Sequence, residues 1–261
     1  MPLFRKLNRN ISVEEKMPYD DLDSYFWTGR VAAETIRKNQ ELWQLQEFSD
    51  ILDMGSGHGR VLRWLKYFYP KAKLTTCDLQ KSARDFCESE FKSKSIKSHE
   101  ELLHVDFQNR FDLIWVGSLL THLDLDEWRI VLHSLNHSLK IGGVLAFTTN
   151  GDLVAQRLKS RDYYGLKEED RIAILKEYDA NQFAFRCYLK ETITNIDEAK
   201  YGISISKPAF VLNFMSELFD MRILFVGEMK WANHQDIYLF IKKEIDPLAP
   251  ELMTKLYSHK D

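Results

Sequence analysis

The residues with the clearest chemical potential are those of 53–60, which read Asp-Met-Gly-Ser-Gly-His-Gly-Arg. They follow the apolar pair Ile51-Leu52 and precede an apolar run with helical spacing at 61–65. Three glycines at alternate positions between a strand and a helix indicate a loop that turns sharply and presents its N–H groups. Because no Cβ stands in the way, the main chain of such a loop can press against a ligand. A plain tight turn is the alternative interpretation.

A second candidate is Asp78, which ends a predicted strand 19 residues after Gly59. A carboxylate at that point can accept hydrogen bonds from both hydroxyls of a ribose. The alternative is that Asp78 caps the helix that follows it. The glycine spacing, Gly-x-Gly-x-Gly with an acid two residues earlier, departs from the Gly-x-Gly-x-x-Gly of dinucleotide-binding loops.

The elements that must position these residues alternate along the first 150 residues. Apolar runs predict strands, and 3.6-residue periodicity predicts helices between them. The predicted strands are 49–54, 73–77, 95–98, 111–116 and 144–149, and the predicted helices are 31–47, 60–69, 81–91 and 124–139. Asp124 and Glu127 form a predicted capping box for the last helix, and Gly142-Gly143 are expected to stop it. This alternation predicts an α/β fold with a mostly parallel sheet and helices on both faces.

The rhythm changes after residue 150. Residues 152–182 have polar helical character, and short strands are predicted at 183–189 and 201–205. An amphipathic helix at 207–219 and two strands, 221–226 and 236–241, complete the chain. We interpret 152–206 as an insertion beside the edge of the sheet where α/β proteins bind ligands.

Composition restricts the class of protein. The 261 residues, 44% hydrophobic and 29% charged, suit one large domain or a domain with an insertion. The net charge of −3 gives no electrostatic reason to expect a nucleic-acid partner. The three cysteines show no metal-type pairing, which favours a reducing compartment, and no stretch approaches the ~18–20 apolar residues of a membrane span. We therefore expect a soluble, cytoplasmic protein whose oligomeric state the sequence leaves open.

The chain resembles the class I S-adenosylmethionine-dependent methyltransferases over about residues 49–149. Residues 53–59 match the family's first motif, Asp78 matches its ribose-binding acid, and 111–116 matches its fourth strand. Residues 139–145 resemble the stretch before its fifth strand, with Ile141 in place of the usual proline. The resemblance implies a Rossmann-like seven-stranded sheet whose last strand, here 236–241, is antiparallel, with an insertion after the fifth strand.

Three shorter stretches narrow the resemblance. Residues 57–65, 117–123 and 234–236 are similar to bacterial methyltransferases often found beside glycosyltransferases. This similarity is the reason for expecting a saccharide or another small molecule as the acceptor.

The resemblance implies S-adenosyl-L-methionine as the cofactor, and its parts need different partners. The glycines of the loop let the backbone approach the amino-acid tail, Asp53 offers negative charge near the cationic end, and Asp78 holds the ribose. Arg30 suits the tail carboxylate geometrically, with a surface helix position as the alternative. Gly117, at the end of the fourth strand, is expected to face the methionine moiety.

The adenine is expected beside the residues that follow the third predicted strand, Ser98 and His99, with Asp106 as the alternative. The full set of residues expected to bind the cofactor is Arg30, Asp53, Gly55, Ser56, Gly57, Asp78, Leu79, Ser98, His99 and Gly117. In domain terms, 1–48 is an N-terminal helical segment covering the cofactor site. Residues 49–261 form the methyltransferase domain, within which 152–206 is an acceptor-side cap.

Methyl transfer is an in-line displacement with a neutral thioether as leaving group, so alignment and exclusion of water supply much of the rate. A general base helps when the nucleophile starts protonated. His122, just past the fourth strand, is the best-placed base, with a structural histidine as the alternative. Tyr201, His234 and Asp236 are expected near the same mouth, and of these Tyr201 is the second catalytic candidate.

Together these patterns predict S-adenosylmethionine-dependent methyl transfer to a small-molecule or saccharide acceptor, with oxygen as the target. A non-catalytic protein that binds the cofactor or a partner is one alternative, and an NAD(P)-dependent oxidoreductase is another. No metal is expected, because His133 and His137 have ligand spacing on one helix but no third ligand is evident.

Overall fold

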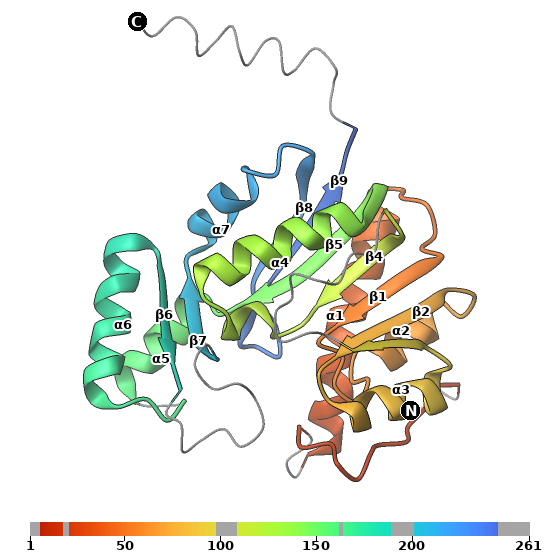
Figure 1. Ribbon diagram of the computed structural model, residues 1–261, viewed down its shortest axis with the longest axis horizontal. Helices are drawn as coiled ribbons and strands as arrows, with labels where there is room; N and C mark the ends of the chain where they lie inside the picture. Colours follow the sequence, from red (N-terminus) through yellow and green to blue (C-terminus); the bar gives the residue numbers. More distant parts are fainter. Residues whose placement is uncertain (1–5, 18–20, 98–108, 162–163, 189–200, 245–261) are drawn as a thin grey trace, which may run out of the picture.

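The computed structural model describes residues 6–17, 21–97, 109–161, 164–188 and 201–244 (Figure 1). Its centre is a seven-stranded sheet in the order β3-β2-β1-β4-β5-β9-β8. The strands are β1 (Asp50–Met54), β2 (Lys73–Asp78), β3 (Lys94–Lys97), β4 (Phe111–Val116), β5 (Leu139–Thr149), β8 (Met221–Trp231) and β9 (Gln235–Lys242). Strands β1 to β5 pair in parallel, whereas β9 is antiparallel to both β5 and β8. The predicted sheet and its antiparallel last strand are confirmed.

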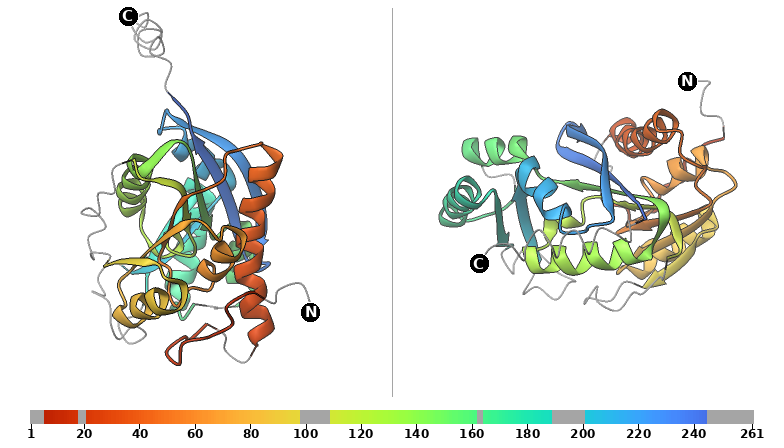
Figure 2. Two further views of the ribbon diagram at one scale, coloured as in Figure 1. Left: turned by 90° about the vertical axis from the view of Figure 1, so that its right-hand side faces the viewer. Right: turned by 90° about the horizontal axis from the view of Figure 1, so that it is seen from above.

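Helices cover both faces of this sheet. The helices flanking it are α1 (Leu22–Leu42), α2 (Leu62–Phe68), α3 (Lys81–Phe91), α4 (Leu125–Ser138) and α7 (Pro208–Met215). Successive strand residues point to opposite faces, so Ile51 of β1 joins the core beneath α1 and α2 while Leu52 joins the core beneath α4 and α7. Figure 2 shows α1 and α4 on opposite sides of the sheet. No helix among the described residues is long and apolar enough to span a membrane.

Helix α1 begins earlier than its apolar pattern predicts, at Leu22 rather than residue 31. The side chain of Asp21 caps it by accepting hydrogen bonds from the N–H groups of residues 23 and 24. The first turns bury Thr28 and Gly29, which are small rather than apolar. A hydrophobic pattern therefore misses the part of the helix that packs most closely.

The junction between α4 and β5 also differs from the prediction. The capping box of Asp124 and Glu127 is confirmed, but α4 ends at Ser138 and Leu139 is already extended. Gly142 and Gly143 lie inside β5 and do not stop the helix. They sit where the register of β5 against β4 shifts, and a Cβ at Gly143 would lie 2.9 Å from the carbonyl oxygen of Phe111.

The insertion forms its own layer beyond β5. It comprises α5 (Asp152–Ser160), α6 (Glu168–Asn181), β6 (Phe183–Cys187) and β7 (Gly202–Ser206), with β6 and β7 paired as an antiparallel two-stranded sheet. These elements share a separate small core that includes Leu158, Ile174 and Ile205. In Figure 1 they lie at the opposite end of the molecule from β2 and β3.

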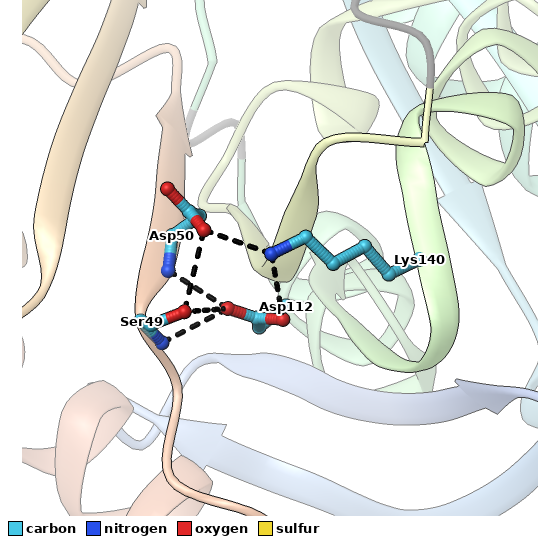
Figure 3. A network of polar contacts seen from close by, with 4 residues as sticks. All are labelled: Ser49, Asp50, Asp112 and Lys140. Carbon is cyan, nitrogen blue, oxygen red and sulfur yellow. Dashed lines mark hydrogen bonds and ion pairs between the residues drawn. The ribbon is translucent and has the colours of Figure 1, made fainter.

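A polar cluster holds the amino ends of three central strands together (Figure 3). Lys140 Nζ lies 2.8 Å from Asp50 Oδ2 and 3.1 Å from Asp112 Oδ1. Asp112 also accepts hydrogen bonds from the N–H and hydroxyl of Ser49. The cluster ties the starts of β1, β4 and β5, and it lies at the edge opposite to the glycine loop.

Candidate functional site

The glycine loop follows β1 and leads into α2. Gly55, Gly57 and Gly59 have φ values of 69°, 50° and 77°, a region that residues with a Cβ rarely adopt. The N–H of Gly55 donates to the carbonyl of Cys77 at 2.8 Å, which fixes the loop to β2; buried Ser56 follows. A Cβ at Gly59 would meet the Phe91 ring at 2.5 Å, whereas one at Gly57 would meet nothing within 4 Å. Gly59 thus permits packing against α3, and Gly57 keeps its side of the loop open.

Asp78 lies directly beside this loop. Its Oδ2 accepts a hydrogen bond from the N–H of Gly57 at 2.8 Å, and its Oδ1 accepts one from the N–H of Gln80 at 2.9 Å. Helix α3 has Gln80, not Asp78, at its N-cap, so the helix-cap alternative does not hold. The neighbouring Leu79 is 38% exposed. The structure therefore brings the loop and the predicted ribose-binding acid together.

Asp53 stands at the end of β1, and only 2% of it is exposed. Its Oδ2 has no hydrogen-bond partner among the described residues. Burial and the negative charge of Asp78 raise the pKa of Asp53 to about 7, with Arg60 opposing the shift. A buried carboxylate oxygen without a donor is costly, and a cationic ligand would relieve that cost.

Helix α1 crosses directly over the loop. A Cβ at Gly29 would lie 2.0 Å from the carbonyl oxygen of Arg60, so the two backbones are in close contact. The Arg60 guanidinium packs over the Trp231 ring, and the indole N–H of Trp231 donates to the Thr28 carbonyl. Arg30, one residue after the crossing, forms an ion pair with Glu34 at 2.5 Å. Its predicted role with the tail carboxylate stays a prediction.

The carboxyl end of β4 turns at Gly117 and Ser118. A Cβ at Gly117 would lie 2.8 Å from Nε1 of Trp115, which explains the glycine by packing within the chain. Thr148 and Gln235 then connect the ends of three strands. Ser118 N–H donates to Thr148 Oγ1 at 2.8 Å, Thr148 Oγ1 donates to Gln235 Oε1 at 2.7 Å, and Gln235 Nε2 donates to Ser118 Oγ at 3.0 Å. The sequence analysis missed this network, whose only signal was polar residues at predicted strand ends.

His122 ends a short 3₁₀ turn, Leu120–His122, that follows β4. Its Nδ1 lies 2.9 Å from the Gly202 carbonyl oxygen and 3.2 Å from the Tyr188 hydroxyl. Because a carbonyl only accepts, Nδ1 carries the proton and Nε2 keeps its lone pair. Burial lowers the pKa of His122, so the ring is neutral at pH 7. These contacts give His122 the protonation state that a general base needs.

Tyr201 stacks on His122, with ring centroids 4.6 Å apart and an interplanar angle of 21°. Burial, with a contribution from the Asp78 carboxylate, raises the pKa of Tyr201 to about 12. Tyr201 is therefore within electrostatic reach of both the predicted base and the predicted ribose-binding acid. The structure brings together two candidates that are 79 residues apart in the sequence. Ser98 and His99 lie outside the described residues.

The remaining candidates lie at the start of β9. Asp236 is buried, accepts a hydrogen bond from the Met229 N–H at 2.8 Å, and has a pKa raised to about 6, chiefly by burial. His234 contacts two residues of the insertion, Arg157 and Tyr164. The sequence analysis did not single out Arg157, although a charged residue on a helix next to the ligand edge is a usable signal.

Comparison with known proteins gives matches of three kinds. Residues 51–143 match the model of a family described as a methyltransferase domain. A malonyl-[acyl-carrier protein] O-methyltransferase of Bacillus anthracis is 26% identical over 166 residues, which are 63% of this chain and 59% of that protein. The chain thus spans about three fifths of the length of the curated relatives it matches.

Two solved structures show the same fold. An S-adenosylmethionine-dependent methyltransferase from Clostridium acetobutylicum ATCC 824 has a TM-score of 0.56 and 15% identity, covering 82% of this chain and 92% of that one. The plantazolicin methyltransferase BpumL in complex with SAH has a TM-score of 0.54 and 16% identity, covering 87% of this chain and 88% of that one. The family match falls on the stretch that holds the glycine loop, Asp78 and β4 within this fold. The chain therefore belongs to the class I S-adenosylmethionine-dependent methyltransferases.

Proposed function

We propose that this protein transfers a methyl group from S-adenosyl-L-methionine to an oxygen atom of a small-molecule or saccharide acceptor. The observation that carries the proposal is the arrangement of Asp53, the open glycine loop and Asp78 at one edge of the sheet. S-adenosyl-L-methionine supplies an electrophilic methyl group on a positively charged sulfur. Gly57 leaves room for it, the unsatisfied Asp53 oxygen suits its positive charge, and Asp78 suits its ribose.

The residues around His122 fit a hydroxyl acceptor. Nε2 of the neutral ring accepts the proton as the acceptor oxygen becomes the nucleophile. The Gly202 carbonyl and the stacked Tyr201 hold the ring in one orientation. Half-buried Tyr188 and Tyr201 restrict the access of water, which favours the charge-dispersing displacement. The O-methyltransferase names of the curated relatives support oxygen as the target atom.

Cofactor identity is tested by thermal shift with S-adenosylmethionine, S-adenosylhomocysteine, NAD⁺ and NADP⁺. We expect stabilisation by the first two only. Stabilisation by the nicotinamide cofactors alone would contradict the proposal. A screen of acceptors with a radiolabelled methyl donor then separates an enzyme from a protein that only binds the cofactor.

Asp78→Ala should weaken S-adenosylhomocysteine binding by roughly 1–3 kcal/mol, because it removes charge-assisted hydrogen bonds to the ribose. Isothermal titration calorimetry measures the change. Asp85→Ala is the matched control, since Asp85 is an exposed acid on α3 whose partner is Lys81. Equal affinity in the Asp78 variant and the wild type would remove the ribose assignment.

A further inference from the structure

A second polar group lies beside the base, at the junction of α5 with the turn between β8 and β9. Thr149 at the end of β5 pairs with Asp236 near the start of β9, so this turn lies at the carboxyl edge of the parallel strands. Helix α5 begins at Asp152, directly after β5. Arg157 of α5 and His234 of the turn therefore meet at the edge where α/β folds bind ligands.

Arg157 has donors to spare and no anion to balance its charge. One Nη1 N–H donates to His234 Nδ1, and an Nη2 N–H donates to the Asn233 carbonyl at 3.3 Å. A guanidinium has five N–H donors, so three remain. None of the ion pairs found among the described residues involves Arg157. On its own helix the positions three and four residues away are Leu153, Val154, Ser160 and Arg161, none of them acidic.

His234 holds Arg157 in place without neutralising it. Its Nδ1 accepts from Arg157, so the proton is on Nε2, which donates to the Tyr164 hydroxyl at 2.8 Å. Burial and the nearby guanidinium both lower the pKa of His234, which is neutral at pH 7. Burial raises the pKa of Tyr164 to about 12, so the phenol is neutral as well. The half-buried positive charge of Arg157 thus faces two neutral rings.

The group is connected to the base by neighbouring tyrosines. Tyr188 approaches His122 at 3.2 Å, and its ring centroid lies 5.7 Å from that of Tyr201. Tyr188 and Tyr164 pack against the same small core of the insertion. Arg157 and His122 are therefore at two ends of one wall built mainly from the insertion.

We propose that Arg157, oriented by His234, binds an anionic oxygen group of the methyl acceptor, a carboxylate or a phosphate, at the insertion side of the active site. The inference rests on the proposed function and narrows its acceptor to acidic small molecules and acidic saccharides. A planar guanidinium with several N–H groups on one side suits either anion, and shielding by the insertion strengthens the pairing. Arg157 acts as a specificity-determining residue, while the methyl group goes to an atom near His122.

The test uses the full chain saturated with S-adenosylhomocysteine, and titrates inorganic phosphate and malonate at constant ionic strength. Wild type should bind at least one of them saturably by calorimetry, and the tighter one identifies the anion class. Arg157→Gln should weaken that binding at least tenfold. Lys159→Gln, which removes an exposed charge from the same helix, should leave it unchanged.

Absence of saturable binding to wild type, or equal binding to wild type and Arg157→Gln, would overturn the inference. Unchanged S-adenosylhomocysteine affinity in Arg157→Gln shows that the variant is folded. If that variant does not fold, Arg157→Lys replaces it; it keeps the charge but loses the guanidinium fork, and should weaken malonate binding. Failure of S-adenosylhomocysteine to bind wild type at all would instead contradict the proposed function, so the two failures are distinguishable.

Discussion

His122 has one ring nitrogen hydrogen-bonded to the protein, which leaves the other as an acceptor. His122→Ala should lower kcat by about 10²–10⁴-fold, the usual contribution of a general base, and leave S-adenosylhomocysteine affinity unchanged. His133→Ala, at an exposed position of α4, is the control. The two constants are measured with a labelled-methyl assay and by calorimetry.

The same histidine sets the expected pH profile. Its folded-state pKa lies below the ordinary value of about 6.5 because of burial. The neutral, active form therefore persists below that pH, and kcat should fall only as the pH drops through the lowered pKa. A rate that does not change between pH 7 and pH 5 would show that no base of this kind is used.

Asp53 predicts proton release on cofactor binding. A pKa of about 7 leaves the free carboxyl roughly half protonated at pH 7. A cationic ligand favours the carboxylate and lowers that pKa, so S-adenosylmethionine should displace up to about half a proton at pH 7 and less at pH 8.5. Calorimetry in buffers of different ionisation enthalpy measures the release.

Asp53→Asn should abolish this release, since the amide does not titrate. S-adenosylhomocysteine, which lacks the positive sulfur, should release fewer protons than S-adenosylmethionine. A binding heat independent of the buffer at pH 7 would contradict the role given to Asp53.

At the scale of elements, the contact between α1 and the glycine loop depends on Gly29. In a helix interior Gly→Ala normally stabilises by about 0.5–1 kcal/mol. Here the added Cβ would lie 2.0 Å from the Arg60 carbonyl, and overpacking of this kind costs about 1–3 kcal/mol. We expect Gly29→Ala to lower the free energy of unfolding and to weaken S-adenosylhomocysteine binding.

Chemical denaturation and calorimetry measure these two effects. Lys38→Ala on the exposed side of α1 is the control for helix propensity. A Gly29→Ala protein more stable than wild type would mean that α1 does not press on the loop as described.

At the scale of the whole molecule, the insertion has its own core, separate from the two cores of the sheet. S-adenosylhomocysteine should therefore slow amide hydrogen exchange in the loop 55–59 and in 78–80, without slowing it in α6 and β6. Mass spectrometry of the exchanged peptides resolves these segments. Equal protection of α6 and the loop would mean that the insertion responds to the cofactor as well.

The sequence alone determined the order of the strands, the glycine loop and the position of Asp78 beside it. These features are local: a strand, a turn with positive φ and a helix follow one another within a few residues. Local patterns failed where packing decides, as at the start of α1, where Gly29 is buried because the loop passes over it. They also failed at Gly142, which lies inside β5.

Only the tertiary structure decided how the second half of the chain meets the first. The contact of His122 with the Gly202 carbonyl joins residues 80 positions apart, and that of Arg157 with His234 joins residues 77 apart. Such pairs depend on how β7 packs beside the turn after β4 and on the register of β9 against β5. Neither is written in the periodicity of a single segment, because a helix or strand pattern specifies which face is buried but not which distant residue it meets.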